Sequence, residues 1–213
     1  MPIAGIAALA IFVAICMILL IQKPAVTKGI LAVMAFQFAF AATGLLRHWD
    51  WTPPPFLPMM LVTFALTIWL AWKGTPALSF AVLIGLQAFR LPLELVMHQA
   101  AVEGIMPVQM SYAGRNFFGC NRDILTGITA IPVAWLAWKG LAPRWLIIAW
   151  NGLGSVLLLN IVTIAVLSIP SIAFFGRDHL NTWVADPPYV WLPGVLVQAA
   201  LWGHISIWKK LYE

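Results

Sequence analysis

Seven runs of apolar residues fill most of this chain, and each is long enough to cross a bilayer as a helix. A spanning helix needs about 20 predominantly apolar residues. The runs cover residues 3–22, 29–47, 56–72, 76–99, 123–138, 144–168 and 188–208. Together they leave no stretch for a separate soluble domain. We therefore predict an all-α fold, a polytopic transmembrane helical bundle of about seven spans that makes residues 1–213 a single domain.

The composition excludes an ordinary soluble protein. Only 9% of the 213 residues are charged and 62% are hydrophobic, and the mean hydropathy is +0.93. Soluble domains carry about 25% charged residues. We expect a multi-pass protein of the cell (inner or plasma) membrane, with membrane lipid as its surroundings.

The positions of the charges predict the orientation. All lysines fall at alternate ends of the runs, where the connections are short, and cytoplasmic loops carry the excess of Lys and Arg. That side holds Lys23, Lys28, Lys73, Lys139, Arg144, Lys209, Lys210 and Glu213. We predict that the N-terminus lies outside, the C-terminus inside, and the longer loops are extracytoplasmic. The net charge of +5 then reflects topology and does not indicate a nucleic-acid partner.

One run carries a stripe of polar side chains, Gln87, Arg90, Glu94 and His98. At 100° per residue these four fall within an arc of about 80° of one helix. Charges at bilayer depth are costly and usually mark a functional site. Arg90 and Glu94 are spaced i,i+4 and can pair. Pro92 lies inside the stripe and removes an amide donor, so a kink is expected there.

The depth of the stripe follows from the helical rise. If the helix starts at Thr75-Pro76, Arg90 lies about 22 Å and Glu94 about 28 Å above that start. The stripe would then open toward the outer surface, and Asn160, at about 24 Å in the sixth run by the same rise, would join it. Asn151 and Gln37 are better explained as hydrogen-bonding residues between helices.

The segment after the stripe supplies further candidates. Arg115 and Asn116 could bind a carboxylate or phosphate, and Asp123 could either join them or cap the fifth helix. Glu94 and His98, one turn apart, could hold a metal with the loop residues His48 and His179. No two histidines share an HxxxH or HExxH spacing, so a metal site is not the prediction. His204, near the inner end of the last run, is expected at the membrane interface.

Several classes of membrane and nucleotide protein are excluded by missing motifs. The last run has no lysine before Lys209 to carry retinal. The chain has no Gly-rich phosphate loop, no G-x-S-x-G nucleophile elbow and no arginine ladder of a voltage sensor.

Several segments resemble a set of small, uncharacterised bacterial multi-spanning membrane proteins. These segments are FRLPLELVMH, PVQMSYAGRNF…DILTG, WNGLG…LLLN and NTWV…PYVWLPG, which cover the C-terminal two-thirds of the chain. The resemblance implies a multi-spanning fold and carries no activity. In that family GRNF runs directly into DI, whereas here the five residues FGCNR intervene.

Three functions fit these observations. The leading hypothesis is binding or transport of a small polar or anionic ligand, with Gln87, Arg90, Asn160, Arg115, Asn116 and Asp123 as ligand-binding residues. Glu94 and His98 would then act as a proton gate. The second is a membrane enzyme acting on a lipid or headgroup, with Glu94 and His98 as acid/base residues or metal ligands. The third is a non-catalytic structural or assembly subunit. The sequence identifies no cofactor and no oligomeric state.

Overall fold

The computed structural model describes residues 2–74, 78–112 and 121–213, and within these ranges it contains helices and no strands. Five helical segments are long and apolar enough to cross a membrane. They are α1 (Pro2–Ile21), α2 (Pro24–Ala42), α3 (Phe56–Gly74), the stretch Phe80–Val102 and α7 (Arg144–Leu167). The prediction of an all-helical protein with several membrane-length apolar helices is confirmed.

Two further helical segments are shorter. They are α6 (Ile124–Trp138) and a π-helical turn, η6 (Leu192–Leu196), that continues into α8 (Val197–Tyr212). Four single-turn 3₁₀ helices lie in the connections: η1 (Leu45–Arg47), η3 (Val108–Met110), η4 (Arg177–His179) and η5 (Trp183–Ala185).

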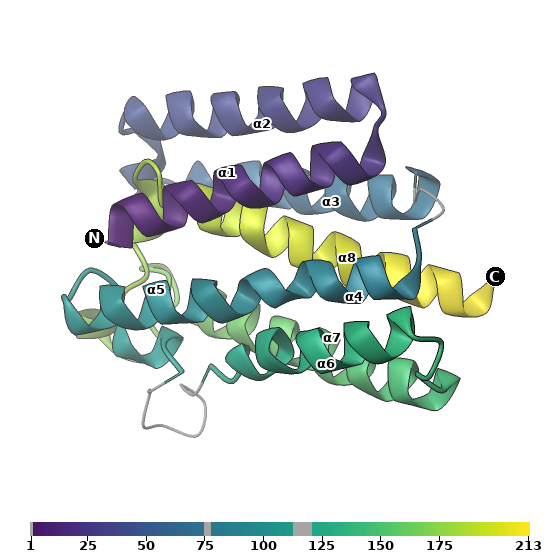
Figure 1. Cartoon of the computed structure of the whole chain (residues 1–213). Coiled ribbons are helices and arrows are strands. Elements are labelled where there is room, and N and C mark those ends of the chain that lie inside the picture. Colours follow the sequence, from purple (N-terminus) through teal and green to yellow (C-terminus); the bar gives the residue numbers. More distant parts are fainter. Residues whose placement is uncertain (1, 75–77, 113–120) are drawn as a thin grey trace.

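The long helices lie roughly side by side, and the two ends of the chain are at opposite ends of the bundle (Figure 1). Helix α8 runs through the middle and packs against α3, α4 and α7. Helix α6 packs against α4 and α5, and α1 packs against α5 and η6. The C-terminal helix is therefore the central element around which the others are arranged.

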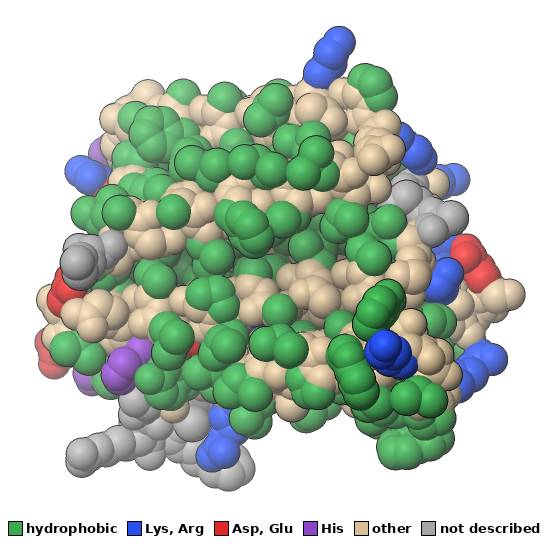
Figure 2. Space-filling view, in the orientation of Figure 1, with side chains coloured by type: hydrophobic (Ala, Val, Ile, Leu, Met, Phe, Trp, Pro, Cys, Tyr) green, Lys and Arg blue, Asp and Glu red, His purple; other side chains and the backbone are tan. Residues whose placement is uncertain are grey.

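The surface has the character of a bilayer-embedded bundle. Hydrophobic side chains cover the visible face between the helix ends, whereas charged side chains gather toward the two ends (Figure 2). Large apolar residues are exposed along α1, α2, α3, α6 and α7, among them Phe12, Leu61 and Trp69. Water would make such a surface unfavourable, and lipid removes that penalty.

The helix that carries the stripe differs in its start from the prediction. Helix α4 (Phe80–Leu86) begins after Ser79, whose hydroxyl accepts a hydrogen bond from the Val82 amide at 3.3 Å. Arg90 therefore lies about 15 Å along the helix from its first residue, compared with about 22 Å predicted from a start at Thr75-Pro76. The stripe is therefore closer to the start of its helix than the sequence suggested.

The expected irregularity near Pro92 takes the form of a 3₁₀ turn. Helix α4 gives way to η2 (Gln87–Phe89), and α5 (Arg90–Val102) follows directly. Pro92 then stands in the first turn of α5, where a proline is tolerated because that turn needs no amide donor. The change of helix type occurs within the stripe itself.

Candidate functional site

Arg90 is the centre of the buried polar cluster, with a side chain that is only 1% exposed. Its Nε donates to Asp123 Oδ2 at 2.6 Å, and its Nη2 donates to Asp123 Oδ1. The two groups form a bidentate, buried ion pair between α5 and the start of α6. Bidentate geometry is the strongest form of this contact. Arg90 thus pairs with Asp123, and the pairing with Glu94 that the i,i+4 spacing allowed is not the one found.

Asp123 occupies the N-cap position of α6, yet its side chain makes no capping hydrogen bond there. Its carboxylate is turned to Arg90 instead. An anion at a helix N-terminus is still favoured by the helix dipole. Between the two roles considered for Asp123, the structure therefore places its side chain in the polar cluster.

His204 binds the third nitrogen of Arg90. Arg90 Nη1 lies 2.7 Å from His204 Nε2, and His204 Nδ1 lies 2.7 Å from Asn151 Oδ1. A guanidinium has no acceptor, so Nε2 must be the acceptor and the ring proton must be on Nδ1. The neutral ring therefore donates to Asn151, whose Nδ2 donates in turn to the His204 carbonyl at 3.1 Å. This arrangement fixes the position of Arg90 from the side opposite Asp123.

Glu94 forms a second buried contact, one turn further along α5. Asn121 Nδ2 donates to both carboxylate oxygens of Glu94, at 2.8 and 2.7 Å, and also reaches the Met110 carbonyl at 3.1 Å. Asn121 Oδ1 accepts from the Asp123 amide at 2.9 Å. Asn121 therefore couples the Glu94 carboxylate to the start of α6, and both side chains are almost fully buried.

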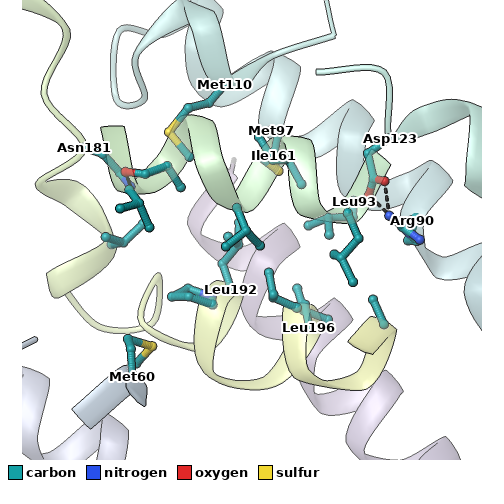
Figure 3. A pocket seen from close by; sticks show the side chains of 18 of the residues that line it. Met60, Arg90, Leu93, Met97, Met110, Asp123, Ile161, Asn181, Leu192 and Leu196 are labelled. Carbon is teal, nitrogen blue, oxygen red and sulfur yellow. Dashed lines mark hydrogen bonds and ion pairs between the residues drawn. The ribbon is translucent and has the colours of Figure 1, made fainter. Parts of the chain in front are cut away.

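A cavity of about 120 Å³ adjoins this cluster. Its walls come from α3, α5, α7, η6 and α8, and they are mostly Leu, Ile, Val, Met and Phe side chains. Four polar residues of the described ranges also line it: Arg90, Glu94, Asp123 and Asn181. Arg90 and Asp123 stand at one end of the cavity and Asn181 stands at the other (Figure 3). The site is thus an apolar chamber with polar groups at its ends.

The four residues of the stripe have different surroundings. Arg90 and Glu94 line the cavity. Gln87 is fully buried against α8, where its Nε2 donates to the Ala200 carbonyl at 3.4 Å. His98 is half-buried at the other end of the stripe, with Nδ1 at 3.0 Å from Ser111 Oγ and its ring tilted against that of Tyr112, with the ring centroids 4.7 Å apart. Neither Gln87 nor His98 is a wall residue of the cavity.

The remaining candidates lie away from the cavity or outside the described residues. Asn160 is half-buried on α7 and does not line the cavity. Arg115 and Asn116 lie outside the described residues. His48 and His179 are exposed in connections, and His48 stacks on Trp51. Within the part of the chain that the structure describes, no group of three His, Cys, Asp or Glu side chains is placed to hold a metal ion.

Three residues of the cluster were not predicted as site residues. His204 was expected at the interface, and the structure places its side chain inside the bundle, 2% exposed and in contact with Arg90 and Asn151. Helix α8 continues to Tyr212, four residues past the predicted end, so His204 lies about 12 Å inside that end. Asn151 was assigned to helix packing, and Asn121 was not considered a ligand of Glu94.

A sequence signal for His204 does exist, in the small residue that faces it. A Cβ atom added at Gly154 would lie 2.5 Å from His204 Cε1. Gly203 and Gly194 similarly leave room for the side chains of Gln87 and Gln37. Glycines in apolar helices often allow close approach of another helix, and here they face buried polar side chains. Pairing each polar residue with a glycine could have located this cluster.

Comparison of the chain with family models, with curated proteins and with solved structures returned no match. The resemblance to small bacterial multi-spanning proteins therefore stays a prediction, and the functional argument depends on the geometry of the site.

Proposed function

We propose that this protein binds a small amphipathic molecule inside its transmembrane bundle, as a binding or transport protein. One observation carries the proposal: an apolar cavity at bilayer depth that has charged side chains at one end. Ligand sites in proteins are typically apolar chambers with a few convergent polar groups. The proposal keeps the predicted seven-span topology, with the N-terminus outside and the C-terminus inside.

The size of the cavity supports a ligand. One water needs roughly 10–15 Å³ by this measure, so 120 Å³ holds far more than a single water. At about 24 cal/mol per Å³, an unfilled apolar cavity of this size would destabilise the fold by about 3 kcal/mol. A bound apolar group would recover much of that free energy.

The cavity wall also extends to the lipid-facing surface. Val166 of α7 lines the cavity and is 45% exposed. Leu57 and Phe64 of α3 are part-exposed wall residues as well. A molecule dissolved in the bilayer could therefore reach the chamber sideways, between α3 and α7. This route favours a ligand that partitions into lipid.

A cavity-filling variant tests the proposal. n-Octanol should stabilise the wild-type protein in lipid nanodiscs, with a saturable rise in the melting temperature, because its chain fills the chamber. Ala165→Phe, on the wall of the cavity, should abolish that rise. Ala149→Phe, on the exposed face of the same helix, is the matched control and should keep it. The readout is the melting temperature at increasing octanol concentration.

The proposal fails if wild-type protein shows no saturable shift, or if Ala165→Phe and Ala149→Phe respond alike. If no apolar ligand changes the melting temperature, the result would instead favour the structural or assembly subunit. For that function the network of Arg90, Asp123, His204 and Asn151 would serve only to join α5, α6, α8 and α7.

A further inference from the structure

We infer that the ligand of this cavity is an amphipathic cation, such as a long-chain amine or quaternary ammonium compound, whose positive head is bound at Glu94. The inference rests on the proposed function and adds the charge of the ligand. It follows from which polar groups of the cavity are already bound and which remain available.

The side-chain nitrogens of Arg90 and Asn121 at the cavity all take part in hydrogen bonds. Each of the three guanidinium nitrogens of Arg90 has a partner, in Asp123 or His204. The amide nitrogen of Asn121 is bound by Glu94 and the Met110 carbonyl. Three of the five N–H groups of Arg90 are used in these bonds, so an anionic headgroup would have to bind beside the Asp123 carboxylate, a like charge, or displace it from the buried bidentate pair. Breaking such a pair leaves an uncompensated charge in an apolar medium and is strongly unfavourable.

The acceptors, by contrast, exceed the donors. Asn181 is 3% exposed, and its Oδ1 is buried without a hydrogen-bond partner among the described residues. Among the described residues, the hydrogen bonds to the Glu94 carboxyl come from a single neutral amide. Carboxylates can accept about four hydrogen bonds. Both ends of the chamber thus offer oxygen atoms to a ligand that brings donors or positive charge.

The formal charges lead to the same conclusion. Among the described residues that line the cavity, Arg90 is the one basic group, whereas Asp123 and Glu94 are both carboxyl groups. His204 adds no charge because its ring is neutral. Because Arg90 is paired with Asp123, the Glu94 carboxyl is left without a cationic partner among these residues, and a bound cation would supply one. A cation bound there would stabilise the ionised carboxylate, and the low polarity of the surroundings strengthens that attraction.

Three ligands with the same chain and different heads test the inference. Octyltrimethylammonium, n-octanol and octyl sulfate are titrated into the protein in nanodiscs of a zwitterionic lipid. We expect the cation to bind at least about tenfold more tightly than the alcohol, and the sulfate more weakly than both. Glu94→Gln should remove the preference for the cation while octanol binding persists. Glu103→Gln, at the exposed end of the same helix, is the matched control and should keep the preference.

The outcomes separate the two proposals. If octanol binds in the chamber but the cation binds no more tightly, the inference on charge is overturned and the proposed function stands. If none of the three ligands binds, the proposed function itself fails. A preference for octyl sulfate would also overturn the inference and would restore Arg90 as the ligand-binding charge. Because Glu94→Gln could disturb the fold, its melting temperature and its octanol affinity are measured beside the cation titration.

Discussion

At the scale of single residues, this site is held together by a chain of polar contacts between neighbouring helices. Asn151, His204, Arg90 and Asp123 each contact the next by hydrogen bonds, and each is almost fully buried. A buried charge is tolerated in a bilayer only if it is paired, because the surroundings offer no water. The network therefore satisfies Arg90 and fixes the end of the cavity at the same time.

Removing one partner of the buried pair should be far more damaging than removing both. Arg90→Met leaves the Asp123 carboxylate buried without a cation, and we expect a loss of about 3–5 kcal/mol in the free energy of unfolding. Arg90→Met combined with Asp123→Leu replaces the pair with apolar groups and should recover most of that loss. Unfolding in mixed micelles with increasing SDS measures both variants. Equal destabilisation in the single and double variants would contradict the pairing.

At the scale of helices, a glycine allows the backbones of two neighbouring helices to come into contact. Gly127 of α6 lies against the backbone of α5, where an added Cβ would collide with Leu91 N and come within 2.9 Å of Arg90 C. Since backbone atoms cannot move aside as a flexible side chain can, the two helices would have to separate. The ion pair between Arg90 and Asp123 depends on this close approach.

Gly127→Ala should therefore lower the stability of the protein. We expect a cost of about 1–3 kcal/mol from overpacking, seen as a lower melting temperature in detergent. Gly29→Ala is a suitable control, because a Cβ at Gly29 of α2 meets no atom within 4 Å. That substitution should be neutral or should raise stability by up to about 1 kcal/mol through helix propensity. The packing argument is wrong if Gly127→Ala is as stable as Gly29→Ala.

The sequence predicts helices better than it predicts contacts between them. The lengths of the apolar runs placed every long helix to within a few residues, apart from α2, which starts at Pro24 instead of residue 29. The polar stripe also indicated that Arg90 and Glu94 lie on an inward face. The sequence could not predict that Arg90 pairs with Asp123, because that pairing depends on how closely α6 approaches α5. The ends of the helices that carry His204 and Arg90 were each misplaced by four residues, which changes the distance of a side chain from the helix end by about 6 Å.

At the scale of the whole molecule, an apolar belt separates two ends at which charges gather (Figure 2). The chain ends lie at opposite ends of the bundle (Figure 1), as an odd number of crossings requires. If the positive-inside rule holds here, the end with every lysine faces the cytoplasm. A ligand that reaches Glu94 from the outer leaflet would then meet a chamber whose inner end is closed by Arg90 and His204.

This orientation predicts a labelling pattern for cysteines placed in exposed connections. After replacement of Cys16 and Cys120, single variants Asp50→Cys, Asp178→Cys and Lys139→Cys are treated with a membrane-impermeant maleimide on intact cells. Asp50→Cys and Asp178→Cys should react, because four spans separate their connections and return the chain to the same side. Lys139→Cys, one span earlier than Asp178→Cys, should react only after permeabilisation. The reverse pattern would invert the topology, and labelling of all three on intact cells would contradict α6 or α7 as a span.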